Sequence, residues 1–224
     1  MRDTRGALER WRAAPSDVLS PWFAGALAIA ILLLLAVWLV SLTVPPDPSG
    51  IELVGISDTN HLREAGSILG RNLLVLALHA TACVAGFIAG SSLRQVAETK
   101  SGFSRIVHER AGPIALVWVA LVTLFSLGTQ AFALGFDAAA ISGDLKISSG
   151  VLILTVLPHA LVELTAVFLP LAAWLIASRR DEWADLLAAT FLTVAIAIPM
   201  LLASAAIEVR VWPTLLRAVS PTLN

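Results

Sequence analysis

Five long runs of hydrophobic residues, separated by shorter polar segments, dominate the pattern along the chain. Each run is long enough to cross a hydrocarbon core of about 30 Å as a helix, which takes about 20 residues. None of the runs alternates polar and apolar residues, as a strand of a membrane β-barrel does. The pattern predicts an all-α integral membrane protein, a bundle of five transmembrane helices at residues 21–44, 73–93, 113–136, 151–178 and 186–207.

The first 20 residues form a polar, basic segment ahead of the first predicted span. Leu8 and Trp11 stand among its arginines, so this segment is either an amphipathic helix on the inner membrane surface or a frayed basic tail. Residues 21–224 are expected to form a single transmembrane domain, because no polar stretch among them is long enough for a soluble core.

The connection between the first two predicted spans opens with a turn-rich stretch at residues 45–50. Leu62, Ala65, Ile68 and Leu69 then recur at helical spacing, with charged residues between them. A helix with this pattern buries one apolar stripe and exposes its charges. We therefore expect an interfacial helix on the outer surface, between the first and second spans.

Basic residues are divided unevenly between the two sides of the predicted bundle. Ten fall in the N-terminal segment, the loop after the second span and the turn after the fourth, whereas five fall on the opposite side. Because basic residues concentrate in cytoplasmic loops, the N-terminus is expected in the cytoplasm and the C-terminus outside. The Ala- and Arg-rich, Lys-poor composition is typical of a high-GC bacterium, so the membrane is expected to be a bacterial cytoplasmic membrane.

The overall composition excludes several classes of protein. Hydrophobic residues make up 58% of the chain and charged residues 14%, against about 25% charged residues in soluble domains. The net charge of −1 provides no basic excess for nucleic acid, so the expected partners are the lipid bilayer and other membrane proteins. The single cysteine, Cys83, excludes an internal disulfide and a multi-cysteine metal site.

A few polar side chains fall inside the predicted spans, where such groups are costly and often functional. His159 and Glu163 are spaced i, i+4 on the fourth span, so they share one helix face and come within hydrogen-bonding reach. Pro158 has no N–H to donate and is expected to kink this helix. The other members of the set are Asn72, His79, Gln130 and Glu208.

All six polar residues are expected at similar depth, in the outer half of the membrane. Two interpretations stay open. The residues either line a polar cavity that opens outward, or they make interhelical hydrogen bonds that fix the bundle.

No catalytic or cofactor-binding pattern accompanies these polar residues. The paired histidines and intervening glutamate of zinc proteases are absent, as are Gly-x-Ser-x-Gly and a phosphate-binding loop. A metal site of His79, His159 and one carboxylate would depend on helix neighbours that the sequence does not define. We therefore expect no enzyme activity, no metal and no cofactor.

Small residues recur at every fourth position of the second predicted span, at Ala82, Gly86 and Gly90. This spacing lets two helix backbones approach closely. The small-residue face is expected to pack on another helix, either within the chain or in a partner.

Two stretches near the C-terminus resemble a known family. Residues 157–168 contain Pro-His-Ala-Leu-Val-Glu-Leu followed by Ala-Val-Phe, and resemble the His-Gly-x-x-Glu-Leu-x-Ala-x-Phe signature of the stage II sporulation protein M family. Residues 199–213, with Ala-x-Ile-Glu and a closing Trp-Pro, resemble that family's last helix, and Asn72 with the glycines of the second span resembles an earlier one. Ala160 and Arg210 depart from the family pattern, which indicates a diverged member.

The resemblance implies a helical membrane bundle that, in endospore-forming bacteria, anchors and recruits peptidoglycan-degrading enzymes. For this chain it favours a membrane scaffold that assembles with membrane or envelope proteins as a homo- or hetero-oligomer. The alternative is a permease subunit of an ABC-type exporter that couples to a separate ATPase. A basic helix before the first span, a charged loop after the second and an outward polar cavity would suit that alternative.

Overall fold

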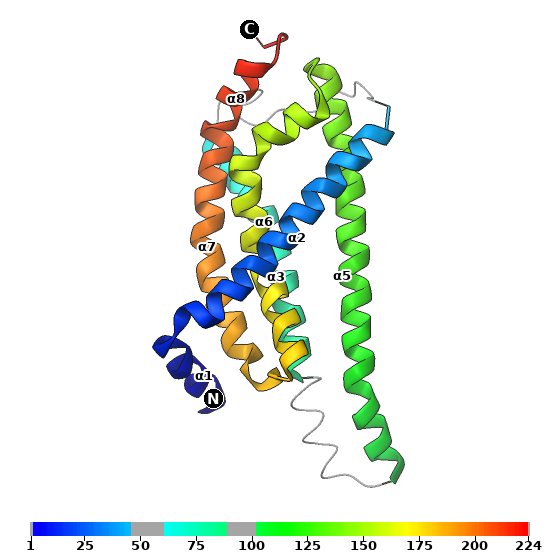
Figure 1. The fold of residues 1–224 in the computed structure, drawn as a ribbon, viewed down its shortest axis with the longest axis vertical. Helices are drawn as coiled ribbons and strands as arrows, with labels where there is room; N and C mark the ends of the chain where they lie inside the picture. The colour runs from blue at the N-terminus through cyan, green and yellow to red at the C-terminus, as the bar shows by residue number, and fades with distance from the viewer. Residues whose placement is uncertain (1, 46–60, 89–101, 224) are drawn as a thin grey trace. The chain divides into compact units, whose positions relative to one another are not determined.

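A computed structural model describes residues 2–45, 61–88 and 102–223, and helices make up nearly all of this part of the chain (Figure 1). No strand occurs among the described residues. The elements are α1 (Arg2–Ala13), α2 (Pro15–Thr43), α3 (His61–Phe87), α5 (Gly102–Asp144), α6 (Ser149–Arg180), the 3₁₀ helix η2 (Trp183–Asp185), α7 (Leu186–Arg210) and α8 (Trp212–Val219).

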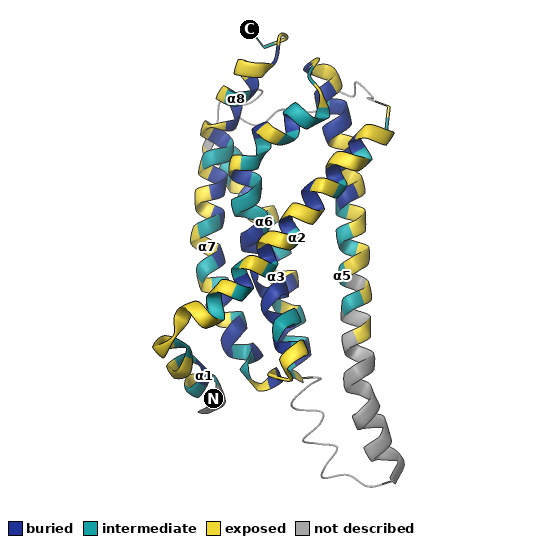
Figure 2. Ribbon diagram, viewed as in Figure 1, coloured by how far each residue is buried: buried dark blue, intermediate teal, exposed yellow. Residues whose placement is uncertain are grey.

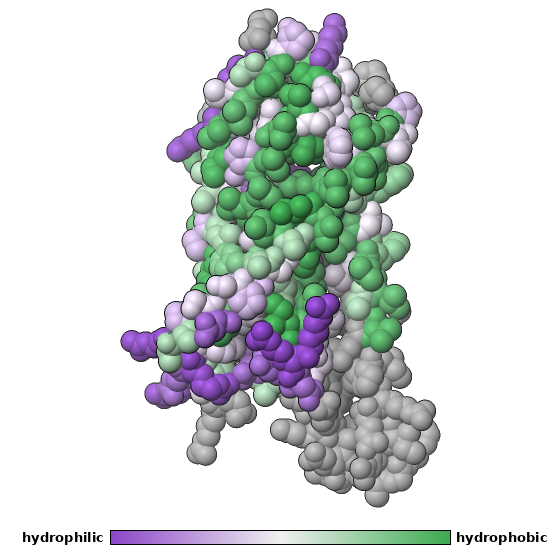
Figure 3. Space-filling view, in the orientation of Figure 1, coloured by the Kyte–Doolittle hydropathy of each residue, from purple (hydrophilic) through white to green (hydrophobic). Residues whose placement is uncertain are grey.

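Five of the described helices are long and apolar enough to cross a membrane. They are α2, α3, α5, α6 and the stretch that contains α7. Hydrophobic side chains cover much of the face shown in Figure 3, and hydrophilic side chains gather around α1 and the end of α6. The predicted all-α class is therefore confirmed, and so is the number of helices long and apolar enough to cross a membrane.

The helix boundaries differ most from the prediction in α3 and α5. The stretch expected to form a separate interfacial helix is the beginning of α3 and is continuous with the second span, so a separate interfacial helix is not confirmed. α5 continues to Asp144 rather than ending near residue 136. Neither segment contains a proline at these points, so the polar residues there lower hydropathy without interrupting the helical hydrogen bonds.

The N-terminal segment is also helical. α1 ends at Ala13, and α2 begins at Pro15, a residue type that suits the first turn of a helix. Pro21, which was expected to begin the first span, lies inside α2. The frayed-tail alternative is therefore wrong for residues 2–13.

The turns that follow α5 and α6 have the same backbone conformation and hydrogen-bond pattern. Lys146 and Asp181 have φ values of 53° and 58°, in the left-handed region. In the first turn, Ile147 N–H donates to the carbonyl of Ser142, and in the second Glu182 N–H donates to that of Ala177. These bonds satisfy carbonyls at the end of each helix, as in the Schellman motif.

The chain divides into two compact units, each of which contains segments of all five long helices. Unit 1 consists of residues 1–26, 74–124 and 166–198, and unit 2 of residues 27–73, 125–165 and 199–224. Figure 2 shows the burial pattern of the described helices.

Apolar close packing holds unit 1. Gly86 on α3 faces Trp174 on α6 so closely that a Cβ atom at Gly86 would lie 2.6 Å from the indole Nε1. The Cys83 thiol, on the same part of α3, donates to the carbonyl of Pro170 at 3.0 Å. Phe168 and Leu169 of α6 are fully buried. Small residues on α3 thus let large side chains of α6 fill the space between them.

Several contacts attach α1 to the other helices of unit 1. Arg10 Nη2 donates to both carboxylate oxygens of Asp185, at 2.9 and 2.7 Å. Trp11 packs edge-on against Trp22 of α2, with ring centroids 5.2 Å apart, and Ala7 is fully buried. The N-terminal helix is therefore attached to η2 and to the start of α2 by three different kinds of contact.

In unit 2, α2 lies close to α5. A Cβ atom at Gly135 would lie 2.5 Å from a Val40 methyl carbon and 3.1 Å from the carbonyl oxygen of Val37. Glycine is therefore required at this helix crossing. A groove of about 480 Å³ lies between α2 and α6 in the same unit, with Trp38 and Leu157 among its apolar lining residues.

Candidate functional site: a polar cluster in unit 2

The cluster is built on the antiparallel pairing of α6 with α7 and α8. Trp212 donates through its indole Nε1 to Thr155 Oγ1 at 3.2 Å, and the Ser204 hydroxyl donates to Glu163 Oε2 at 3.3 Å. Both pairs have the same midpoint in sequence, between Trp183 and Ala184 of η2. The two pairs therefore define one register.

This register places His159 level with Glu208. The His159 side chain is 7% exposed, and its ring packs edge-on against Trp212 with centroids 5.8 Å apart. Glu208 interacts electrostatically with Glu163, which lies one turn along α6 from His159. Three ionisable side chains thus gather within about one helical turn.

The contact between His159 and Glu163 differs from the expected one. The two residues share a helix face, but no hydrogen bond joins their side chains in the described structure. The fully buried Ser204 hydroxyl connects them instead, with its oxygen 3.1 Å from the His159 carbonyl oxygen and 3.3 Å from the Glu163 carboxylate. The imidazole Nδ1 is buried and has no hydrogen-bond partner among the described residues.

α3 forms the third side of the cluster. Ile68 packs with Ala205 and Val209 of α7, which fixes the face that α3 presents. One turn further along α3, Asn72 faces Glu163, and its buried amide nitrogen has no hydrogen bond of good geometry. Four of the six polar residues singled out in the sequence, Asn72, His159, Glu163 and Glu208, are therefore brought together.

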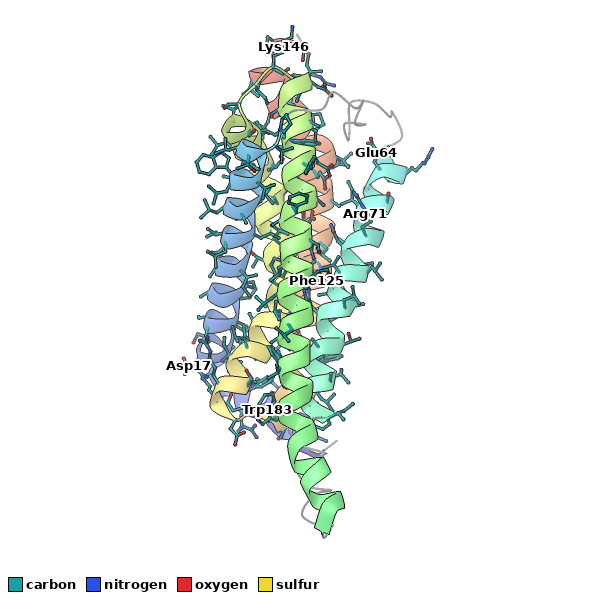
Figure 4. All side chains as sticks on the ribbon, turned by 90° about the vertical axis from the view of Figure 1, so that its right-hand side faces the viewer. Asp17, Glu64, Arg71, Phe125, Lys146 and Trp183 are labelled. Atoms are coloured by element: carbon teal, nitrogen blue, oxygen red, sulfur yellow. The ribbon has the colours of Figure 1, made fainter. Side chains whose placement is uncertain are left out.

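Arg71 and Glu64 add two charges from α3 (Figure 4). Arg71 interacts electrostatically with Glu163 and Glu208, and Glu64 interacts with Glu208. The cluster therefore contains three carboxylates and one guanidinium group. Sequence reasoning placed Glu64 on the water-facing side of the expected interfacial helix and counted Arg71 among the basic residues of the outer side, so it missed both, although the i, i+7 spacing between them is a helical signal.

The other two polar residues lie elsewhere. His79 belongs to unit 1, where its buried ring packs edge-on against Phe168 with centroids 5.3 Å apart. Gln130 lies on α5, and its amide donates to Ser126 Oγ of the same helix at 3.1 Å. A metal site shared by His79, His159 and a carboxylate therefore has no support from these contacts.

The predicted small-residue face is found in part. Gly86 is buried against Trp174 within unit 1, and Ala82 is half-buried on the same helix. Gly90 lies outside the described residues. In Figure 1 the first half of α6, which contains Pro158, changes direction, as expected for a helix that contains proline.

The cluster contains both acceptors and donors. The carboxylate oxygens accept hydrogen bonds, the Arg71 guanidinium and the Asn72 amide nitrogen donate them, and the His159 Nδ1 does either according to its tautomer. No group of three or more His, Cys, Asp or Glu side chains converges like metal ligands in the part of the chain that the structure describes.

Comparison with known proteins adds no assignment for this chain. No protein-family model, curated protein or solved structure matches it.

Proposed function

We propose that this chain is a scaffold of the bacterial cytoplasmic membrane that recruits membrane or envelope proteins. The five apolar helices support a multi-pass membrane protein, and the distribution of basic residues supports a cytoplasmic N-terminus and an extracytoplasmic C-terminus. The resemblance of residues 157–168 and 199–213 to the stage II sporulation protein M family supports partners that remodel peptidoglycan.

The observation that carries the proposal is a difference between glycines of α3. Trp174 occupies the space beside Gly86. Gly66 and Gly70, in contrast, are exposed and have no described atom within 4 Å of an added Cβ. Gly66 and Gly70 are four residues apart, so they form one face on a helix that is apolar enough to cross a membrane. Helix pairs in membranes associate through such faces, because small residues allow close backbone contact.

Site-specific photocrosslinking tests the proposal. A benzophenone amino acid at Ser67, which is exposed between the two glycines, should give a discrete adduct in living cells. Gly66→Leu with Gly70→Leu should remove that adduct. A benzophenone at Ala203 of α7, which is also exposed, serves as the control and should not give the same product. Absence of an adduct at Ser67, or an adduct that persists in the double variant, contradicts recruitment through this face.

The proposed orientation has a separate test. In a Cys83→Ala background, single cysteines at the exposed positions Asp144 and Thr222 should react with an impermeant thiol reagent in intact cells. A cysteine at the exposed Glu182 should react only after the cells are opened. Labelling of Glu182→Cys from outside would reverse the orientation.

A permease subunit of an ABC-type exporter is the second candidate, and the attachment of α1 favours it. The Arg10–Asp185 contact and the Trp11–Trp22 pair fix an N-terminal helix against the α6–α7 turn. A fixed helix at that place offers a surface to which a separate ATPase could couple. Crosslinking from the exposed Arg5 of α1 distinguishes the candidates, because an adduct with an ATPase supports the permease and its absence supports the scaffold.

A further inference from the structure

The side chains between α6 and the α7–α8 stretch form a regular ladder. Glu163 contacts Ser204 at 3.3 Å, and the other contact that sets the register, about two helical turns further on, is 3.2 Å long. His159 and Glu208 lie opposite each other halfway between these two contacts. Residues four apart share one helix face, so all of these side chains belong to one interface.

The Ser204 hydroxyl carries one hydrogen but contacts two oxygen atoms. It is fully buried, and its Oγ lies 3.1 Å from the His159 carbonyl oxygen and 3.3 Å from Glu163 Oε2. A carbonyl has no hydrogen to donate, so the hydroxyl must be the donor in the shorter contact. The contact with Glu163 is then a hydrogen bond only if the carboxyl group is protonated and donates to Ser204. Protonation of Glu163 thus reverses the direction of one contact and satisfies both.

The imidazole of His159 gives a second, independent observation. The side chain is 7% exposed, and its Nδ1 has no hydrogen-bond partner among the described residues. Its ring packs on Trp212, so it faces the same stretch as Glu163 does, with Glu208 opposite. A neutral imidazole has one tautomer in which Nδ1 donates and another in which it accepts. His159 can therefore pair with Glu208 in either protonation state of that carboxyl.

The charges around the two carboxyl groups favour one proton between them. Glu163 and Glu208 interact with each other, and Arg71 of α3 interacts with both. Both carboxyls are half-buried on helices that are apolar enough to cross a membrane. One guanidinium balances one carboxylate, and two carboxylates that share a site away from water usually keep one proton between them.

The other polar groups of α3 are compatible with a protonated carboxyl. Asn72 faces Glu163, and its amide has an oxygen that accepts and a nitrogen that donates. Glu64 interacts with Glu208, and the exposed Arg63 lies next to Glu64 at the start of the helix. Glu64 and Arg63 both interact with further groups, and the balance between Arg71 and the two carboxyls does not depend on them.

We propose that Glu163 and Glu208 form a proton-binding site that holds one proton between them. At rest the proton is on Glu163 Oε2, which donates to Ser204, and Ser204 donates to the His159 carbonyl. In the second position the proton is on Glu208, opposite the His159 imidazole. Transfer turns one carboxylic acid into a carboxylate and the other carboxylate into an acid, so the pair keeps a single negative charge. The site is independent of the scaffold function.

Infrared spectroscopy of the purified full chain in lipid nanodiscs tests the site, because a protonated carboxyl has a C=O absorption that an ionised one lacks. The parent protein should show this absorption at neutral pH, and raising the pH should remove it. Glu163→Gln together with Glu208→Gln should abolish it. Glu182→Gln, at an exposed carboxyl of unit 1, is the matched control and should leave it unchanged.

The position of the proton has its own measurement. Ser204→Ala should shift the frequency of the absorption, because the Glu163 carboxyl loses the hydroxyl to which it donates. Ser41→Ala removes a buried hydroxyl that bonds only within its own helix, and should not shift it. Glu163→Gln alone should remove or shift the absorption, since the proton is lost or transferred to Glu208.

Three results would overturn the proposal. The first is no carboxylic-acid absorption from the parent protein at neutral pH. The second is an absorption that the double glutamine variant retains or, if that variant does not fold, that Glu163→Gln and Glu208→Gln each leave unchanged. The third is an absorption that Ser204→Ala leaves at the parent frequency, which would remove Glu163 as the resting position.

Discussion

Units 1 and 2 contain segments of the same five long helices, yet different forces hold their helix contacts. In unit 1, Gly86 and Trp174 interlock, and the helix contacts are apolar apart from the Cys83 thiol and the Arg10–Asp185 ion pair. In unit 2, Ser204 connects the backbone of α6 to the Glu163 carboxylate, and charged residues gather around it. Apolar close packing fixes a contact by shape, whereas a polar cluster fixes it by hydrogen bonds and charges that must satisfy one another.

The largest effect is expected from filling the packed glycine of unit 1. Gly86→Leu should lower stability by about 1–3 kcal/mol or more, because the buried Trp174 and Leu186 leave no space for a side chain. Gly66→Leu on the same helix is the matched control and should be neutral or slightly stabilising, since leucine favours helix by up to about 1 kcal/mol over glycine. Detergent thermal unfolding of the two variants measures the difference, and similar losses would contradict the packing.

A smaller loss is expected in unit 2 from Ser204→Ala. The buried hydroxyl connects α7 to α6, so its removal should cost about 1–2 kcal/mol. Ser41→Ala is the control, because the Ser41 hydroxyl is also buried but bonds only within its own helix, to the carbonyl of Trp38. If the two alanine variants unfold at the same midpoint, the Ser204 contact does not hold the helices together.

His159→Phe should change stability by less than about 1 kcal/mol. The imidazole Nδ1 makes no hydrogen bond, and a phenyl ring preserves the edge-on contact with Trp212. A large loss of stability on this substitution would support the interpretation of the residue as a structural hydrogen-bonding group.

The smallest effect is expected from Asp185→Asn at the surface of unit 1. The ion pair with Arg10 is exposed on the arginine side, and exposed pairs contribute about 0–1 kcal/mol. The variant should unfold almost like the parent protein, while limited proteolysis should cut α1 faster. Unchanged proteolysis would show that Trp11 and Ala7 hold α1 without the ion pair.

The sequence was sufficient for the helical class and for the five spans, because hydrophobic runs of that length have few other solutions. The predicted second span begins at residue 73 and the predicted third span ends at residue 136, whereas α3 begins at His61 and α5 ends at Asp144. Polar residues such as Arg71 and Asp137 lower local hydropathy but do not stop a helix. Hydropathy locates the apolar part of a helix rather than its hydrogen-bonded ends.

For the polar cluster, the sequence supplied four members but not their partners. Spacing along one helix relates His159 to Glu163, whereas the contacts of Ser204 and Trp212 depend on how two helices face each other. The sequence does contain part of the information on how α6 and α7 face each other. A tight turn between α6 and α7 makes residues equidistant from it neighbours, which would have matched Glu163 with Ser204. The contribution of α3 had no such signal, because the chain between α2 and α3 is long and gives no register.

The two left-handed turn residues have a consequence for the depth of the helices. Glycine is usual at that position, since other residues there incur a steric cost of roughly 1–2 kcal/mol, yet the chain has Lys146 and Asp181. Both are charged, and a charge at a helix end resists being drawn into hydrocarbon. Glycine would ease the backbone at either turn, but it would remove a charge from a position beside others, such as Asp144 at the first turn and Arg180 at the second. The charged residues thus add to the resistance of each turn to immersion in hydrocarbon, at the expense of an unstrained turn.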